Sequence, residues 1–379
     1  MRIAIALAAA CGAALVAVNR VEPTSAPPEQ HTPPPLVPLR PRPEPLRPPR
    51  RLNRRPPQFV VVSFDGAGGT QLWPYWRSVG RRAHAHFTFF VSGVYLLAEE
   101  RRNLYRPPRH RRGVSDIWFA RPAGRRPALA VVRGTLEQIA AAYREGHEIA
   151  THFNGHFCEP YRGNVDEWKG RDWRRELDGF DRLLFHASEN NALRPPVTLP
   201  FGREEVVGER TPCLQGRLPL LYRVLAARGF RYDASALARL GSWPRRRLGL
   251  WSVPLLEIPF TGHDFPVVSM DYNFFANQTG AVSAGPAAEA RIERETYLSL
   301  RNAFRTSYLG NRAPVSFANH FETWNHWAYD RALSRLVLES CGLPEVRCVS
   351  YRERVDWLDA QPPARLRRYE AGRFLVYRP

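Results

Sequence analysis

Most of the chain alternates short apolar runs with amphipathic stretches of helical length, and this alternation restricts the fold more than any other feature. A strand buried on both faces reads as a continuous apolar run, whereas a covering helix has apolar residues three or four apart. The apolar runs 59–64 and 87–91 flank the helical stretch 72–84, which predicts a β-α-β unit. A helix over 135–145 and a strand over 148–150 continue the pattern. The sequence therefore predicts a parallel α/β fold.

The same pattern predicts further elements along the rest of the chain. Residues 100–130 are rich in arginine, proline and glycine, and we expect an inserted loop there. Further strands are predicted over 205–209 and 315–318, and further helices over 165–188, 218–227 and 332–340. No internal repeat and no second stretch of linker composition follows, so residues 58–379 are predicted to form one domain.

The first 57 residues differ in composition from the rest. Arg2 precedes a mostly apolar run over residues 3–18, which fits a secretory signal peptide within residues 1–20. The run is shorter than the roughly 20 residues of a membrane-spanning helix, but an uncleaved N-terminal anchor that tethers the protein to a membrane is the alternative. Residues 21–57 are rich in proline and arginine and predict a disordered linker. We therefore expect an exported protein that is extracellular, in the cell wall, or membrane-anchored and facing outward.

Four cysteines remain when Cys11, within the apolar N-terminal run, is set aside. An oxidising compartment allows them to form disulfides. Cys341 and Cys348 lie seven positions apart and fit a short loop, which leaves Cys158 and Cys213 as the second pair. Four cysteines allow three connectivities, so this pairing is a hypothesis, with buried free thiols as the alternative.

The net charge of +19 suggests nucleic-acid binding, but the distribution of the basic residues argues against it. Lys169 is the only lysine among the 55 basic residues, and the arginines are spread along the chain. They accompany no helix-turn-helix, zinc ribbon or other nucleic-acid module. We predict a generally basic surface without a nucleic-acid partner, with an attraction to anionic polymers as a secondary property.

Polar residues directly follow several predicted strands, which matters because α/β folds place their sites at the carboxyl ends of strands. A turn, a surface ion pair or a hydrogen-bonded histidine explains each of them when taken alone. A four-residue histidine spacing can also bring two imidazoles to one metal ion. Five residues occupy these positions: Asp65, His152, His156, Arg210 and His320. The ordered set, more than any one member, indicates a site.

Taken in order, these residues resemble the motifs of the polysaccharide deacetylase family, the NodB-homology carbohydrate esterases. The matching segments, from the first motif to the fifth, are Ser63-Phe64-Asp65, His152 with His156, Arg210-Thr211-Pro212, Tyr232-Asp233-Ala234-Ser235, and His320. The resemblance extends over residues 58–358. It implies a distorted (β/α) barrel of the NodB-homology type, and a hydrolase that removes N-acetyl groups from a polysaccharide such as peptidoglycan.

The resemblance also implies a role for each matching residue. Asp65 would be the catalytic base, oriented and charge-paired by Arg210. His320 would protonate the leaving amine, with its basicity tuned by Asp233. These roles together supply the base and the acid that amide hydrolysis needs.

A divalent metal such as zinc is the further implication, with His152 and His156 as ligands. Gly66 departs from the family pattern, because a metal-binding aspartate belongs at this position. Two imidazoles alone form a weak metal site, and we predict Asp271 as the third ligand. The departure leaves two alternatives open: a metal-independent amidohydrolase of the same fold, and a catalytically reduced protein that binds a glycan in the same groove.

Overall fold

The structure is a computed structural model that describes residue 35 and residues 55–374. The predicted signal or anchor lies outside the described residues, as does nearly all of the predicted linker. Among the described residues, no helix combines the length and the apolar character that crossing a membrane requires.

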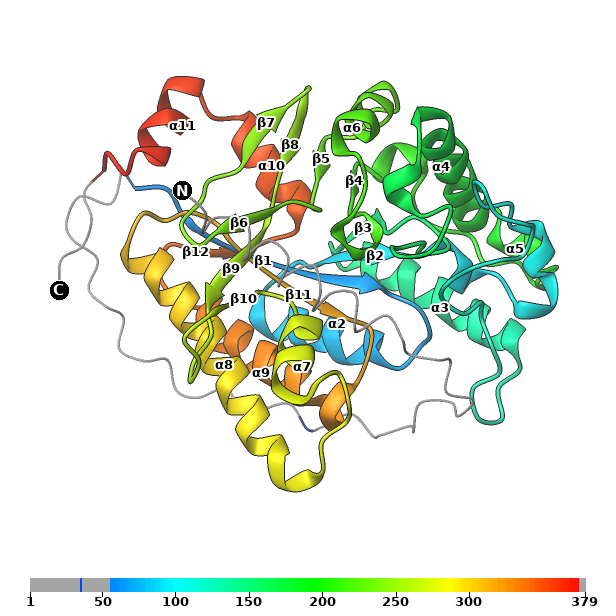
Figure 1. Ribbon diagram of the computed structural model, residues 1–379, viewed down its shortest axis with the longest axis horizontal. Helices are drawn as coiled ribbons and strands as arrows, with labels where there is room; N and C mark the ends of the chain where they lie inside the picture. The colour runs from blue at the N-terminus through cyan, green and yellow to red at the C-terminus, as the bar shows by residue number, and fades with distance from the viewer. Residues whose placement is uncertain (1–34, 36–54, 375–379) are drawn as a thin grey trace, which may run out of the picture.

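A mostly parallel sheet runs through the centre of the described chain, with helices on its outer side (Figure 1). Its strand order is β11-β1-β2-β3-β4-β5-β8-β7, and β12 pairs with β1. Only β7 runs antiparallel to its neighbour. The strands are β1 (Gln58–Gly66), β2 (Thr88–Val91), β3 (Glu148–Thr151), β4 (Gly208–Glu209), β5 (Tyr232–Asp233), β7 (Arg245–Arg247), β8 (Leu250–Ser252), β11 (Val315–His320) and β12 (Val346–Cys348).

A small second sheet, in the order β10-β9-β6, closes the central sheet into a distorted barrel. Its strands are β6 (Leu237–Arg239), β9 (Leu255–Pro259) and β10 (Pro266–Val268). On one side, β6 and β9 follow β5 and β8 of the central sheet after short connections, and in one of these the N–H of Val253 donates to the carbonyl of Asp233 at 2.9 Å. On the other, the N–H of Ala318 in β11 donates to the carbonyl of Ser269 at 2.9 Å. The predicted distorted α/β barrel is therefore confirmed.

Most of the helices bury an apolar face against the outside of the barrel, whereas α11 has no buried residue. In α2, Trp73, Trp76 and Val79 recur at helical spacing and are fully buried. The Trp76 ring packs on Phe64 of β1, with ring centroids 4.5 Å apart. The helices are α2 (Leu72–Ala83), α3 (Ala128–Arg144), α4 (Gly170–Phe185), α5 (Ala187–Asn190), α6 (Leu218–Ala227), α7 (Asp271–Thr279), α8 (Pro286–Leu309), α9 (Trp324–Ser340), α10 (Tyr351–Asp359) and α11 (Pro363–Glu370).

Helix α10 covers the end of the barrel at which the parallel strands begin. Its Trp357 ring lies 4.9 Å from the ring of Phe59, near the start of β1. Its buried Tyr351 points into the barrel and contacts Arg210. The opposite end, where the parallel strands finish, is therefore the one available for a site.

Several predicted boundaries need correction. The strand predicted over 205–209 is reduced to β4, because Arg203–Glu205 forms a 3₁₀ turn. The helix predicted over 165–188 begins at Gly170, after a separate 3₁₀ turn that the side chain of Asn164 caps. Helix α3 begins at Ala128, inside the predicted loop. The predicted helix 218–227 is confirmed at both ends.

Both predicted disulfides are confirmed. Cys158–Cys213 joins the segment after β3 to the turn after β4. Cys341–Cys348 joins the end of α9 to β12. The first bond lies next to two of the predicted motifs, so it links two of the loops that surround the site.

Candidate active site

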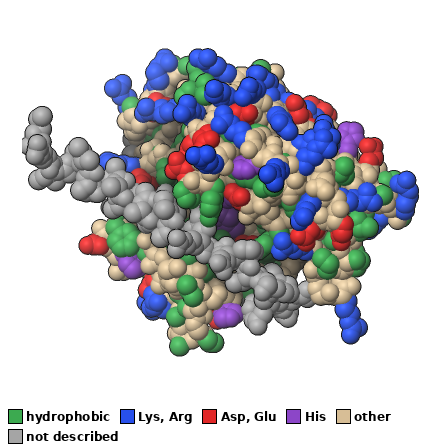
Figure 2. Space-filling view, turned by 45° about the vertical axis from the view of Figure 1, so that its right-hand side comes forward, with side chains coloured by type: hydrophobic (Ala, Val, Ile, Leu, Met, Phe, Trp, Pro, Cys, Tyr) green, Lys and Arg blue, Asp and Glu red, His purple; other side chains and the backbone are tan. Residues whose placement is uncertain are grey.

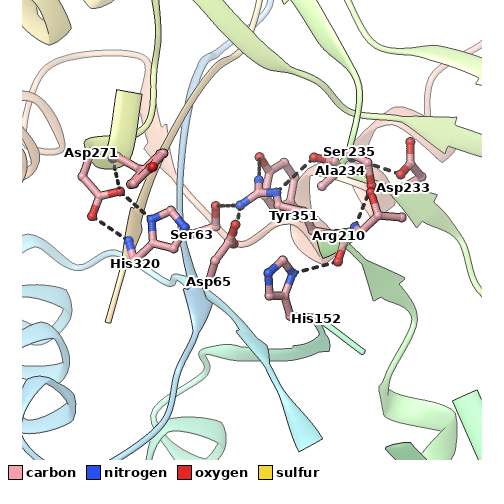
Figure 3. Close-up of polar contacts among 12 residues, drawn as sticks. Ser63, Asp65, His152, Arg210, Asp233, Ala234, Ser235, Asp271, His320 and Tyr351 are labelled. Atoms are coloured by element: carbon pink, nitrogen blue, oxygen red, sulfur yellow. Dashed lines mark hydrogen bonds and ion pairs between the residues drawn. The ribbon is translucent and has the colours of Figure 1, made fainter. Parts of the chain in front are cut away.

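The predicted site residues come together at the carboxyl ends of the barrel strands (Figure 3). Asp65 is the next-to-last residue of β1 and His320 the last residue of β11, and the two residues lie opposite each other in the parallel register of these strands. His152 follows β3 and Arg210 follows β4. Parallel neighbours place their last residues on one rim, which explains why side chains far apart in the sequence meet here.

Asp65 and Arg210 form a buried ion pair. Arg210 Nη1 donates to Asp65 Oδ1 at 2.6 Å, and both side chains are almost completely removed from solvent. Burial alone raises the pKa of Asp65, but the positive charge of Arg210 and the neighbouring His152 and His320 outweigh it and hold that pKa below its usual 3.8. Asp65 is therefore a carboxylate at neutral pH.

Arg210 is held on every side of its guanidinium. Nη1 also donates to Ser63 Oγ at 3.0 Å, Nε to the carbonyl of Ala234 at 3.0 Å, and Nη2 to Tyr351 Oη at 3.1 Å. The group lies 4.5 Å from the centre of the Phe90 ring. These contacts fix the guanidinium, which in turn fixes the orientation of the Asp65 carboxylate.

His320 is held by Asp271 at the start of α7. Both the backbone N–H and Nδ1–H of His320 donate to the Asp271 carboxylate, each at 2.7 Å. Burial lowers the pKa of His320, but the charge of Asp271 and its hydrogen bond outweigh it and raise that pKa above 6.5. With Nδ1 engaged, Nε2 is the ring nitrogen that can donate a proton to a ligand.

The prediction that Asp233 tunes His320 is wrong. Asp233 lies on the far side of Arg210 from His320 (Figure 3), where it accepts hydrogen bonds from Tyr222 Oη at 2.6 Å and from the N–H of Ser235 at 3.0 Å. Asp271, which was predicted as a metal ligand, occupies the place beside His320 instead. The sequence motif around Asp233 therefore has a structural role in this chain.

The two further predicted metal ligands are neutral imidazoles. His152 Nδ1 lies 2.8 Å from the carbonyl oxygen of Arg210 and so carries the ring proton, which leaves Nε2 free to accept. Burial lowers the pKa of His152, and burial together with its histidine neighbours lowers the pKa of His156 to about 3. The two ring centroids lie 5.1 Å apart.

These residues do not fit a metal site with three protein ligands. Asp271 does not complete the site as predicted, because its carboxylate, engaged by His320, forms no cluster with His152 and His156 in which all ligand atoms lie within 4.8 Å of one another. The ligand atoms of Asp65, His152 and His156 do not all lie within 4.8 Å of one another. His156 does lie this close to two sulfur atoms, but those sulfurs belong to the Cys158–Cys213 disulfide and are not thiolates.

The ring of Tyr95 packs against Gly66, the position at which the deacetylases that the sequence resembles carry a metal-binding aspartate. A Cβ built on Gly66 would lie 3.4 Å from Cε2 of Tyr95, and one built on Gly68 only 2.6 Å from Cγ of the same ring. Gly68 is therefore required for the close approach of the ring, and Gly66, at φ +86°, keeps the conformation that favours glycine.

Tyr95 and Glu322 are site residues that the sequence analysis did not identify. Tyr95 belongs to the 3₁₀ turn Gly93–Leu96 after β2, and Glu322 comes two residues after His320. Burial raises the pKa of Glu322 to about 7 although the His320 charge opposes this shift. Burial also raises the pKa of Tyr95, so its hydroxyl keeps its proton. The sequence signal that could have identified Tyr95 and Glu322 is their position shortly after a predicted strand, where α/β folds place site residues.

The rim of the site is partly aromatic. The Trp324 ring lies 5.2 Å from the His320 ring and stacks on Phe275 at 5.0 Å, while remaining half-buried. In the space-filling view a histidine side chain lies at the floor of a hollow, with hydrophobic and acidic side chains beside it (Figure 2). A polar floor with an aromatic wall suits a ligand that has both hydrogen-bonding groups and apolar faces.

No model of a known protein family matches the chain, and no curated protein matches it. Solved structures with a similar arrangement include a candidate polysaccharide deacetylase from Mycobacterium smegmatis, with 15% identity, a TM-score of 0.47, and coverage of 80% of this chain and 90% of that one. The chitin deacetylase from Colletotrichum lindemuthianum has 12% identity, a TM-score of 0.43, and coverage of 82% and 90%.

A CE4 family pseudoenzyme from Bacillus anthracis is also similar, with 10% identity, a TM-score of 0.41, and coverage of 79% of this chain and 66% of that one. The proteins in these three structures carry the names of the group that the sequence motifs resemble. Because the TM-scores are low, the functional case rests on the side chains of the site.

Proposed function

We propose that the protein is a hydrolase that removes N-acetyl groups from a polysaccharide by acid-base catalysis. The observation that carries this proposal is the facing pair Asp65 and His320, on neighbouring strands and in the same register. Arg210 keeps the first group a carboxylate, and Asp271 favours the protonated form of the second. A base and an acid poised on either side of one position are what the hydrolysis of an amide requires.

The reaction uses water as the nucleophile. Asp65 takes a proton from the water as its oxygen attacks the carbonyl carbon of the acetyl group. The carbon–nitrogen bond then breaks, and His320 gives its proton to the departing nitrogen. The products are acetate and a free amine on the sugar, and the proton taken by Asp65 restores the acid form of His320 through solvent.

The negative oxygen of the tetrahedral intermediate needs a donor, and Tyr95 supplies it in this proposal. Its ring packs against Gly66, the residue after Asp65 in the sequence, and its hydroxyl remains protonated. A phenol is an established kind of oxyanion donor. His152, His156 and the nearby carboxylates do not form a metal site with three protein ligands. No step of the proposed reaction therefore passes through a metal ion.

The choice of a polysaccharide as substrate is supported by the motif order and by the half-buried Trp324 at the rim, because aromatic faces pack on sugar rings. Export of the protein is proposed on two grounds. The N-terminal apolar run fits a signal or membrane tether, and two disulfides are stable in an oxidising compartment. A cell-wall glycan such as peptidoglycan is then the accessible substrate.

Acetate release from N-acetylated peptidoglycan fragments tests the proposal. We expect release by the wild-type protein that is unchanged by a metal chelator, and release lowered by roughly 10²- to 10⁴-fold in Asp65→Asn. Asp264→Asn, which removes an exposed carboxylate on a loop, is the matched control and should behave as wild type. Loss of activity on chelation would contradict the metal-free reaction.

Gly66 favours one second candidate, a catalytically reduced protein that binds a glycan in the same groove. The chain lacks a side chain at this position, and Tyr95 covers it. In that case the fragments would bind with equal affinity to the wild type and to Asp65→Asn, and neither protein would release acetate. Calorimetric titration of the two proteins with the same fragments separates the candidates.

A further inference from the structure

A cluster of exposed arginines lies along the edge strand β7, around the turn at the amino end of β8, and on the neighbouring α11. All three residues of β7, Arg245 to Arg247, are exposed, and Leu248 at the following turn is 57% exposed. The C-terminal part of the described chain adds more arginines beside them. We call the set the basic end face; its members are Arg245, Arg246, Arg247, Leu248, Arg365, Arg367, Arg368 and Arg373.

Strand pairing fixes the position of this face. β8 runs parallel to β5, with Ser252 opposite Asp233 at the carboxyl end, and β7 pairs antiparallel with β8. The turn at Leu248 therefore lies at the amino end of β8, away from the rim that carries Asp65. The Trp243 ring, just before β7, stacks on Tyr369 of α11 at 5.7 Å, so both parts of the face are contiguous.

The arginines of the basic end face outnumber the carboxylates close to them, so the face has a net positive charge. Asp359 contacts Arg246 and Arg231, and Asp356 contacts Arg231, so these two carboxylates are already paired. Glu370 is the remaining exposed carboxylate of α11. Figure 2 shows Lys and Arg side chains gathered along the top of the molecule, where Figure 1 places α11 and the β7–β8 turn, with hydrophobic side chains among them.

We infer that the basic end face docks on an anionic lipid membrane, with arginines on the lipid phosphates and Leu248 at the level of the headgroups. Basic side chains around an exposed apolar residue are the combination that binds such an interface. A soluble polyanion would use the arginines but would gain nothing from an exposed leucine.

The path of the chain supports the same partner. β1 begins at the end of the barrel where the β7–β8 turn of the basic end face lies, and the sequence before it comprises residues 1–57. They contain the apolar run 3–18, predicted as a signal or anchor. Docking through this face would direct the rim with Asp65 away from the lipid, toward polymers outside the membrane. The inference does not depend on the reaction proposed for that rim.

Co-sedimentation of the full chain with lipid vesicles tests the inference. The probes are vesicles of phosphatidylcholine alone and vesicles that also contain phosphatidylglycerol. The apolar run 3–18 contributes to binding on both, whereas the arginines of residues 1–57 and those of the basic end face respond to the anionic lipid only. The part of the ratio of the two partition coefficients that is lost on substitution within the basic end face therefore reports on that face. We expect a ratio well above one that falls with added salt.

The double variant Arg245→Gln/Arg247→Gln should lower this ratio roughly 30-fold. The matched control Arg294→Gln/Arg305→Gln removes two exposed arginines from α8 and should leave it within about twofold. Leu248→Asn should lower binding to the anionic vesicles roughly tenfold. Acetate release should be the same in all of them.

Three results would overturn the inference. The first is an anionic-to-neutral partition ratio that is the same for Arg245→Gln/Arg247→Gln as for the wild type. The second is an equal fall of this ratio in the control Arg294→Gln/Arg305→Gln, which would indicate that overall charge, and not this face, causes the binding. The third is unchanged binding by Leu248→Asn together with full displacement from the vesicles by soluble polyphosphate, which would identify a polyanion as the partner.

Discussion

Replacing Asp65 by asparagine is expected to destabilise the fold as well as remove the base. Arg210 is fully buried, and among the described residues Asp65 is the one carboxylate that forms an ion pair with it. Removing one partner of a buried ion pair costs about 3–5 kcal/mol, because the other charge is left without compensation. Asparagine still offers an oxygen to Nη1, and Ser63, Ala234 and Tyr351 keep their contacts, so the lower end of that range, about 3 kcal/mol, is expected.

For a domain of this size, 3 kcal/mol corresponds to a Tm lower by about 4 °C. Thermal unfolding followed by circular dichroism measures it, with Asp264→Asn as the control of equal charge change. The double variant Asp65→Asn/Arg210→Met should lose clearly less than the sum of the two single losses, because it removes both members of the pair. A Tm of Asp65→Asn equal to that of the control, or simple additivity, would refute the reasoning.

The stability that Asp65→Asn loses relative to the wild type should become smaller as the pH falls. The pKa of Asp65 is lowered in the folded protein, so its carboxylate stabilises the fold fully above the unfolded value of 3.8, and that stabilisation is lost as the pH falls through the folded pKa. The stability difference between wild type and Asp65→Asn should therefore be complete at pH 7 and should narrow below 3.8. A difference that stays constant into that range would point to a cause other than charge.

Three further changes have defined outcomes. Asp271→Asn removes the charge that raises the pKa of His320, so the alkaline limb of the kcat/KM profile should move to lower pH; an unmoved limb would exclude His320 as the acid. Tyr95→Phe should lower kcat by roughly 10²- to 10³-fold with little change in KM, whereas an equal rise in KM would indicate a role in binding. Glu209 is fully buried beside Asp233, and burial with that negative charge raises its pKa well above 4.5, so wild-type stability should fall as the pH rises above 4.5. Glu209→Gln should flatten this part of the Tm profile, and parallel profiles of variant and wild type would contradict the assignment.

The sequence predicted the elements whose burial is continuous or periodic. β1 is buried along nearly its whole length, and α2 buries one face, so both appear directly as apolar patterns. β6 and β7 are short and largely exposed, and β7 consists of three arginines. Such strands are stabilised by their neighbours and not by their own side chains, and the sequence alone carries no pattern for them.

The site was predictable where a residue lies at the carboxyl end of a strand, as Asp65 and His320 do. It was not predictable where tertiary packing supplies the partner. Asp271 lies 49 residues before His320, and the link between them comes from α7 packing at the end of β11. The motif at Asp233 suggested the wrong carboxylate, because local sequence cannot tell which of two aspartates the barrel directs toward the histidine.

The Cys158–Cys213 bond has a consequence for when the protein becomes active. It connects the stretch that bears His156 with the turn that follows Arg210, so a single covalent link sets the spacing of two walls of the pocket. A newly made chain in a reducing cytosol lacks that disulfide, and we expect that the two loops are not held at a fixed spacing there. With the export and the deacetylation that we propose, maturation would coincide with arrival in an oxidising compartment, and acetylated sugar precursors inside the cell would not be hydrolysed.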